Sequence, residues 1–150
     1  MYQRILVAFD GSEPSRIALE HALALARDQR AQLRVVHALE SFHYIVSAGG
    51  FAFDAEELMA SLRREGERVL AQAQEQAAKA GVQAETTLLE SASRDDRTST
   101  ILLREARRWN ADLVVLGTHG RRGFDRVFLG SVAESLVRTA TLPVLLVRAK

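Results

Sequence analysis

Cysteine is absent from this chain of 150 residues, which also contains only two prolines and one tryptophan. A chain without cysteine has no disulfide framework, no cysteine-ligated zinc site and no thiol nucleophile, which is typical of proteins in a reducing compartment. Hydrophobic residues make up 47% of the chain. We therefore expect one domain, spanning residues 1–150, that is held together by an apolar core.

An excess of charge of one sign is also lacking. The 20 basic and 19 acidic residues are spread along the chain and leave a formal net charge of +1. This balance gives no electrostatic basis for binding a nucleic acid or an anionic membrane. No apolar run approaches membrane-spanning length, and the first residues lack the long apolar stretch of a signal peptide. We predict a cytoplasmic protein with no nucleic-acid partner and no membrane partner.

Several motifs of nucleotide and metal chemistry are missing as well. The chain contains neither G-x4-G-K-[ST] nor G-x-G-x-x-G, the glycine loops of two large nucleotide-binding classes. Its histidines show no metal-ligand spacing, so we predict no metal site built from side chains. These histidines are His21, His37, His43 and His119. All except His119, which lies in a glycine-rich loop, are interpreted as structural.

What the chain does contain is a regular alternation of short apolar runs and amphipathic segments. Helical spacing predicts helices after Pro14, over Glu56–Ala80, over Thr100–Trp109 and after Ser131. Short apolar or alternating runs predict strands at Ile5–Phe9, Leu33–Leu39, Val82–Leu88, Leu113–Leu116 and Pro143–Val147. The alternation favours an α/β fold, a single open five-stranded and mainly parallel sheet with helices on both faces, and Val82–Leu88 as an outer strand.

Two stretches have no regular pattern. Ser41–Asp54 is aromatic and contains glycine, and we predict a loop that either packs on the edge of the domain or covers a ligand. Ser91–Thr98 contains Arg94, Asp95, Asp96 and Arg97, which we interpret as a solvated turn with helix-capping acids.

The longest predicted helix, Glu56–Ala80, contains Gly66. We expect this glycine to lower the stability of the helix by about 1 kcal/mol relative to alanine.

The most informative stretch is Ala111–Val132. Its buried strand stops at Gly117, a basic loop follows from Gly120, and a helical pattern begins at Gly130 and Ser131. Glycine lets backbone N–H groups approach a ligand, and a helix N-terminus adds unpaired donors and a partial positive charge. A loop of this kind is suited to an anion, most often a phosphate.

Asp10 follows the first predicted strand and precedes the first predicted helix. Its carboxylate either caps the turn or faces a crevice beyond the carboxyl end of the strand. The residues alone leave both roles open.

The spacing Gly117-x2-Gly120-x9-Gly130-Ser131 resembles the G-x2-G-x9-G-[ST] motif of the ATP-binding branch of the universal stress protein family. The stretches A-F-D-G-S, V-V-H-A and L-P-V-L-L-V-R are similar to the same family, so the resemblance covers nearly the whole chain. It implies the strand order 3-2-1-4-5, which the wider adenine nucleotide α-hydrolase-like fold shares. In that order the first and fourth strands meet at the topological switch point, where ligands bind.

The resemblance also implies an ATP site, with Mg²⁺ arriving together with the nucleotide. Asp10 and the backbone of Ala38 would contact the adenosine part, and the glycine loop would hold the ribose and the phosphates. Arg121 would neutralise phosphate charge. The implied ATP-binding residues are Ala8, Phe9, Asp10, Ala38, Leu116, Gly117, His119, Gly120, Arg121, Gly130, Ser131 and Val132.

The implied function is that of a small stress or regulatory protein whose nucleotide state tunes its assembly or partner binding. No base beside a nucleophile is recognisable, so we assign no catalytic residue and expect at most a weak ATPase. The alternatives are a slow ATP hydrolase or nucleotidyl-transferring enzyme of the same superfamily, and a nucleotide-free dimeric scaffold. Relatives dimerise through the last strand, and an apolar edge invites pairing. We therefore predict a homodimer through Val144, Leu145, Leu146 and Val147.

Overall fold

The structure is a computed structural model that describes residues 1–39, 55–93, 96–119 and 129–149. The predicted loop Ser41–Asp54 lies outside the described residues. So do four residues that were singled out from the sequence, namely Arg94, Asp95, Gly120 and Arg121.

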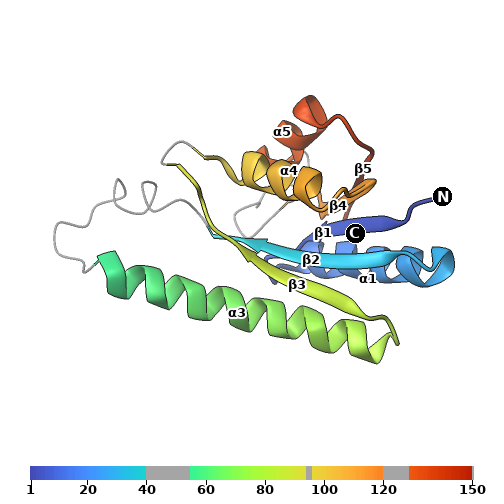
Figure 1. Ribbon diagram of the computed structural model, residues 1–150, viewed down its shortest axis with the longest axis horizontal. Coiled ribbons are helices and arrows are strands. Elements are labelled where there is room, and N and C mark those ends of the chain that lie inside the picture. The colour runs from blue at the N-terminus through green and yellow to red at the C-terminus, as the bar shows by residue number, and fades with distance from the viewer. Residues whose placement is uncertain (40–54, 94–95, 120–128, 150) are drawn as a thin grey trace.

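Five parallel strands form one sheet in the order β3-β2-β1-β4-β5 (Figure 1). The strands are β1 (Arg4–Ala8), β2 (Gln32–Ala38), β3 (Ala84–Leu89), β4 (Leu113–Gly117) and β5 (Val144–Val147). This order confirms the predicted α/β fold and the outer position of the third strand. Because the strands are parallel, the carboxyl ends of β1 and β4 lie at the same end of the sheet.

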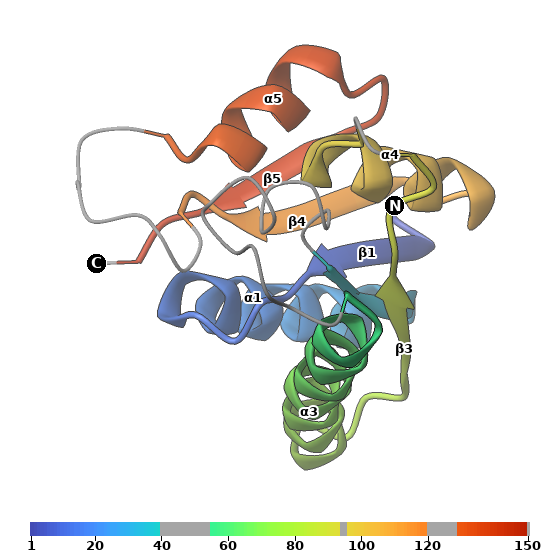
Figure 2. The ribbon, with the colours of Figure 1, turned by 90° about the vertical axis from the view of Figure 1, so that its left-hand side faces the viewer.

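Helices cover both faces of the sheet. Within the described residues they are α1 (Glu13–Gln29), α3 (Ala55–Lys79), α4 (Thr98–Arg108) and α5 (Ser131–Thr139). Figure 2 shows α1 and α3 on one side of the sheet, with α4 and α5 on the other. Each side has its own core, one around Val7 and Leu19 and the other around Leu6 and Leu102. None of the described helices combines the length and apolar character needed to cross a membrane.

Gly66 is buried in α3, on the side of the helix that faces β2 and β3. A Cβ at this position would lie 2.5 Å from Leu88 Cδ1 and 3.1 Å from His37 Cδ2. The glycine therefore permits close packing of α3 on β2 and β3, a role that helix propensity alone does not reveal.

The turn before α4 differs from the sequence-based prediction. The N-cap residue of α4 is Arg97, which makes no side-chain capping bond. The carboxylate of Asp96 instead accepts hydrogen bonds from the backbone N–H groups of Ala92 and Ser93, at 2.8 and 3.1 Å. It also pairs with Arg104 at 2.8 Å, and only 8% of its side chain is exposed. Asp96 thus fixes the turn and neither caps the helix nor projects into solvent.

Candidate functional site

The carboxyl ends of β1 and β4 lie side by side. Val7 is paired with Val115, and this register, continued by two residues, brings Phe9 level with Gly117. Asp10 follows Phe9 directly. The two regions predicted to meet in one crevice are therefore adjacent, at the point in the sheet where the strand order reverses.

Asp10 holds the turn between β1 and α1. Its Oδ1 accepts a hydrogen bond from the Ser12 backbone N–H at 3.0 Å and another from the Ser12 hydroxyl. Gly11 adopts a positive φ of 78° between them, which glycine tolerates at little cost. Ser12 in turn caps α1 by accepting from the backbone N–H of Ser15. The turn-forming role of Asp10 is thus observed, and its contact with a nucleotide stays a prediction.

His37 ties β2 to the end of β1. Its Nδ1 lies 2.8 Å from the carbonyl oxygen of Phe9, which can only accept, so the imidazole ring is the donor. The backbone N–H of Phe9 donates to Val36 at 2.9 Å. These bonds fix the end of β1, and with it Asp10, against the end of β2, where Ala38 follows His37. The interpretation of His37 as a structural residue agrees with this contact.

Gly117 ends β4 against the first turn of α1. A Cβ on Gly117 would lie 2.8 Å from the Cβ of Pro14 and 2.9 Å from its carbonyl carbon. The missing side chain therefore lets α1 and β4 approach each other. Spacing alone could not reveal this packing role, because Pro14 and Gly117 are far apart in the chain.

Backbone hydrogen bonds join the two ends of the glycine loop. The N–H of Gly130 donates to the carbonyl oxygen of Thr118 at 2.8 Å, and the N–H of Thr118 donates to Val147 at 2.9 Å. A Cβ on Gly130 would lie 3.0 Å from that Thr118 oxygen. The start of α5 is therefore held beside the end of β4.

The N-terminus of α5 presents backbone donors that the helix itself does not satisfy. Gly130 is the N-cap residue and makes no side-chain capping bond. The N–H groups of Ser131, Val132 and Ala133 have no acceptor within the helix, because the first turn of an α-helix lacks the preceding carbonyls. Together with the helix dipole, these groups favour an anion. The side chain of Ser131 is exposed, and that of Val132 is half-buried.

His119 lies next to this helix N-terminus. Its Nδ1 is 3.1 Å from the hydroxyl oxygen of Thr118. Its Nε2 is buried and has no hydrogen-bond partner among the described residues. An unpaired buried polar group costs about 1–3 kcal/mol, so a ligand that reached this nitrogen would be stabilised by it.

The structure thus gathers ten of the twelve predicted residues at one end of the sheet. Ala8 and Leu116 belong to β1 and β4, and Leu116 is buried whereas Ala8 is half-buried. Gly120 and Arg121 lie outside the described residues. In the part of the chain that is described, no group of three or more metal-ligating side chains occurs.

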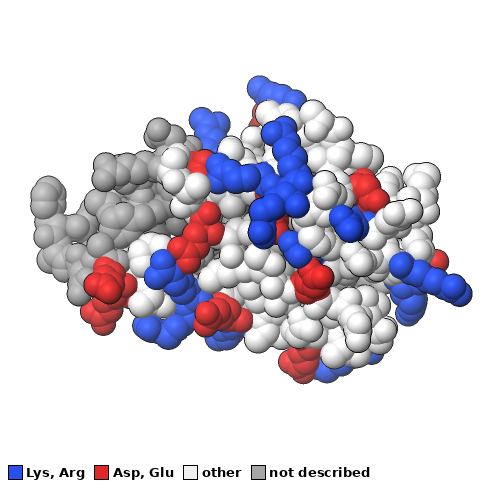
Figure 3. All heavy atoms as spheres, in the orientation of Figure 1, with Lys and Arg blue, Asp and Glu red and all other residues white. Residues whose placement is uncertain are grey.

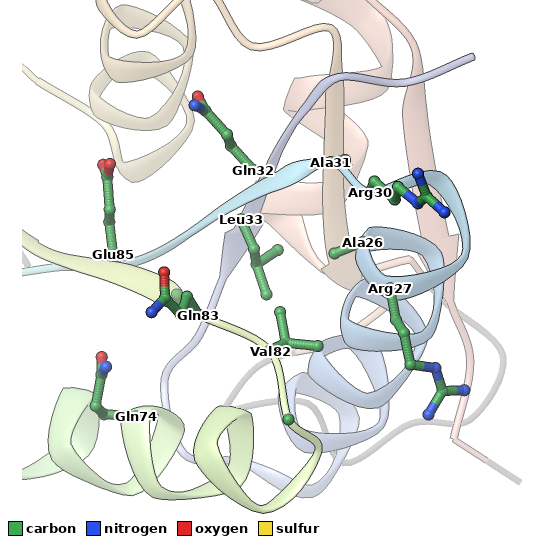
Figure 4. Close-up of a pocket in the computed structure, with 12 residues that line it drawn as sticks. Ala26, Arg27, Arg30, Ala31, Gln32, Leu33, Gln74, Val82, Gln83 and Glu85 are labelled. Carbon is green, nitrogen blue, oxygen red and sulfur yellow. The ribbon is translucent and has the colours of Figure 1, made fainter.

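A cavity of about 730 Å³ lies elsewhere, at the amino ends of β2 and β3. Figure 4 shows the side chains of Leu33 and Val82 pointing toward each other, whereas Arg27 and Arg30 direct their guanidinium groups away from them. The cavity lies at the opposite end of the strands from Asp10 and Gly117, and its lining residues include no serine, threonine, cysteine or histidine. We therefore place the candidate site at the ends of β1 and β4.

Comparison with known proteins gives a consistent assignment. The profile of the universal stress protein family matches residues 1–148. Universal stress protein YxiE of Bacillus subtilis is 34% identical over 153 aligned positions, which cover 99% of this chain and all of the relative. A crystal structure of a family member from Burkholderia pseudomallei is also 34% identical, with a TM-score of 0.77, and the match covers 99% of this chain and 97% of that one.

Two further solved structures contain nucleotides. A universal stress protein in complex with cAMP is 25% identical, with a TM-score of 0.72 and 99% coverage of both chains. The universal stress protein of Archaeoglobus fulgidus in complex with dAMP is 25% identical, with a TM-score of 0.70 and coverage of 97% of this chain and 98% of that one. Since the family profile spans nearly every residue and a relative above 30% identity is covered over its full length, the chain belongs to the universal stress protein family.

Proposed function

We propose that this chain binds ATP at the carboxyl ends of β1 and β4, and that its nucleotide state tunes its assembly or its binding to partners. The observation that carries the proposal is the hydrogen bond from Gly130 to Thr118, because it holds the N-terminus of α5 at the end of β4, and β4 is paired with the strand that leads into the turn of Asp10. The complexes of two relatives with cAMP and dAMP support an adenine nucleotide.

The residues present fit such a ligand. Free N–H groups at Ser131 and Val132 suit the phosphates, and the buried Nε2 of His119 supplies a further polar contact. Asp10 and the backbone of Ala38 would contact the adenosine part. Mg²⁺ would arrive with the nucleotide, because phosphate oxygens and water supply most of its ligands in such sites.

One contact favours slow ATP hydrolysis as a second candidate function. The hydroxyl of Thr118 lies 3.1 Å from the imidazole Nδ1 of His119, so a ring that can take up a proton stands beside a hydroxyl group. Release of phosphate from ATP, compared between the wild type and His119→Ala, tests this candidate. Turnover that is lost in the variant would support it, and equal rates would remove His119 from any catalytic step.

We further propose that two copies of the chain pair through β5. This strand lies at the edge of the sheet, and its apolar residues Val144, Leu145 and Leu146 are only half-buried in the single chain. The bond from Val114 to Pro143 and the parallel register leave the backbone groups of Val144 and Leu146 facing away from β4. Unpaired edge groups beside apolar side chains favour the addition of another strand.

The nucleotide proposal is tested by calorimetric titration of the purified protein with ATP, AMP and adenosine, each with and without Mg²⁺. We expect ATP to bind more tightly than adenosine, because only ATP uses the N–H groups at α5. Equal affinities would remove the phosphate site, and an absence of binding would favour the nucleotide-free scaffold. Light scattering with and without ATP then tests whether the nucleotide changes the assembly.

A further inference from the structure

The exposed side of α4 carries three arginines and no acidic residue. Arg104, Arg107 and Arg108 are spaced three and four positions apart, so they project from one face of the helix, and all three are exposed. Glu105 is the acid of this helix, and only 4% of its side chain is exposed. Figure 3 shows blue basic side chains gathered over the position of α4.

The carboxylates near this helix are internal partners of the arginines. Glu105 accepts from Arg34 at 2.7 Å and from Arg108 at 2.8 Å. Asp96 is held by both terminal nitrogens of Arg104 and is largely covered. These two carboxylates are therefore largely covered, and the charges on the exposed side of α4 are those of the arginines.

The three arginines retain donors for a second partner. Arg107 has no carboxylate partner and no side-chain hydrogen bond among the described residues. Arg108 uses Nε and Nη2 for Glu105, which leaves Nη1, and Arg104 uses both terminal nitrogens, which leaves Nε. With 48% of Arg104 and 68% of Arg108 exposed, these donors are accessible.

We propose that Arg104, Arg107 and Arg108 form a docking surface for a carboxylate-rich, acidic peptide segment of a partner protein. Residues three and four positions apart on a helix have Cβ atoms about 5–6 Å from each other, so these guanidinium groups can bind a short run of carboxylates together. A nucleic acid fits less well, because three arginines on little more than one helical turn can neutralise few phosphates. The formal net charge of +1 provides no wider basic surface along which a phosphate backbone could continue. This surface is separate from the nucleotide site and does not depend on it.

The test is the binding of a fluorescein-labelled peptide of eight glutamates to the full chain, measured by fluorescence anisotropy. Arg107→Glu reverses a charge without breaking a described pair, and we expect it to weaken binding about three- to tenfold. The matched control is Arg64→Glu, an exposed position on α3 that also lacks a described partner, and its affinity should stay within about twofold of the wild type. Binding should also weaken between about 50 and 200 mM salt.

Three results would overturn the proposal. The first is that the wild type does not bind the glutamate peptide at low salt. The second is that Arg107→Glu and Arg64→Glu lose the same amount of affinity for the peptide. The third is that a labelled single-stranded DNA binds more tightly than the peptide and depends on Arg107 in the same way. Circular dichroism confirms that each variant is folded. If Arg107→Glu does not fold, Arg107→Gln replaces it, with an expected loss of about two- to threefold and the same control.

Discussion

Pro14 packs directly against Gly117, with its ring and backbone where a side chain at Gly117 would lie. Pro14 belongs to the first turn of α1, and Gly117 is the last residue of β4. The contact therefore joins the two segments that border the proposed nucleotide site. It gives Gly117 a role in folding that is independent of any ligand.

We expect Gly117→Ala to destabilise the protein by about 1–3 kcal/mol, because the new Cβ meets backbone atoms that cannot rotate away. Gly66→Ala is the matched control. The shortest contact there is to a terminal methyl group of Leu88, which can move, and alanine adds about 1 kcal/mol of helix propensity. Its net effect should be within about 1 kcal/mol of zero. Urea denaturation measures both, and equal losses would contradict the assignment of the Gly117 contact.

The features that were predictable from the sequence are those with a local pattern. Apolar runs such as Leu113–Leu116 identify strands, and the spacing from Gly117 to Ser131 identifies a loop before a helix, because both patterns lie within one short stretch. The close packing of Pro14 on Gly117 was not predictable, since it depends on the tertiary approach of α1 and β4.

Predictions were less accurate at the start of one strand and for a side chain that has several possible hydrogen-bond partners nearby. The third strand begins at Ala84, two residues after its predicted start at Val82. Asp96 was assigned to a solvated turn with capping acids, but Arg104, which follows eight residues later in α4, is its partner instead of the helix N-terminus. Spacing alone does not distinguish these alternatives, because a carboxylate before a helix suits either one.

The ion pair of Asp96 with Arg104 predicts a dependence of stability on pH. The hydrogen bonds from Arg104, opposed by desolvation and assisted by the N–H groups of Ala92 and Ser93, lower the pKa of Asp96 from 3.8 to about 2. Because the folded-state pKa is depressed, this stabilisation is fully present above about pH 4 and is lost as the pH falls toward 2. The difference in unfolding free energy between the wild type and Asp96→Asn should shrink over this interval. A difference that stays constant from pH 5 to pH 2 would contradict the pairing.

The proposed dimer predicts a specific effect of Leu146→Pro. The backbone N–H of Leu146 faces away from β4, so proline removes a donor from the free edge and leaves the pairing of β5 with β4 intact. The expected result is a folded monomer by light scattering at micromolar concentration. Leu145→Pro is the control, because the Leu145 N–H faces β4 and its loss should destabilise the fold itself. A dimer that persists in folded Leu146→Pro would exclude pairing through this edge.

Asp10→Asn separates the two roles of Asp10. Asparagine keeps an oxygen that can accept from Ser12, so the melting temperature should change little. If the charge of Asp10 also contacts the adenosine part, ATP and adenosine should both lose about the same affinity, on the order of tenfold. Titration of both ligands measures this effect. Unchanged affinity for both would confine Asp10 to the turn.

Ser131 provides the sharpest test of the phosphate site. α5 begins at Ser131, and its N-cap residue is Gly130, so the hydroxyl of Ser131 does not cap the helix. Removing it in Ser131→Ala should therefore change stability by only a few tenths of a kcal/mol, well below the roughly 1 kcal/mol of a lost cap. A hydrogen bond to a charged phosphate contributes about 1.5–3 kcal/mol, which corresponds to about ten- to a hundredfold in affinity.

Ser131→Ala should accordingly lower the affinity for ATP by that factor and leave adenosine unaffected, because adenosine has no phosphate. Ser135→Ala is the matched control on the same helix, since its hydroxyl bonds to Ser99 at 2.8 Å on the side facing α4. It should lower stability without changing the ratio of ATP affinity to adenosine affinity. Calorimetric titration of both ligands gives this ratio for each variant. A ratio that is the same in wild type and Ser131→Ala would mean that the Ser131 hydroxyl makes no contact with the phosphates, and any anion there would be held by the backbone N–H groups of α5 alone.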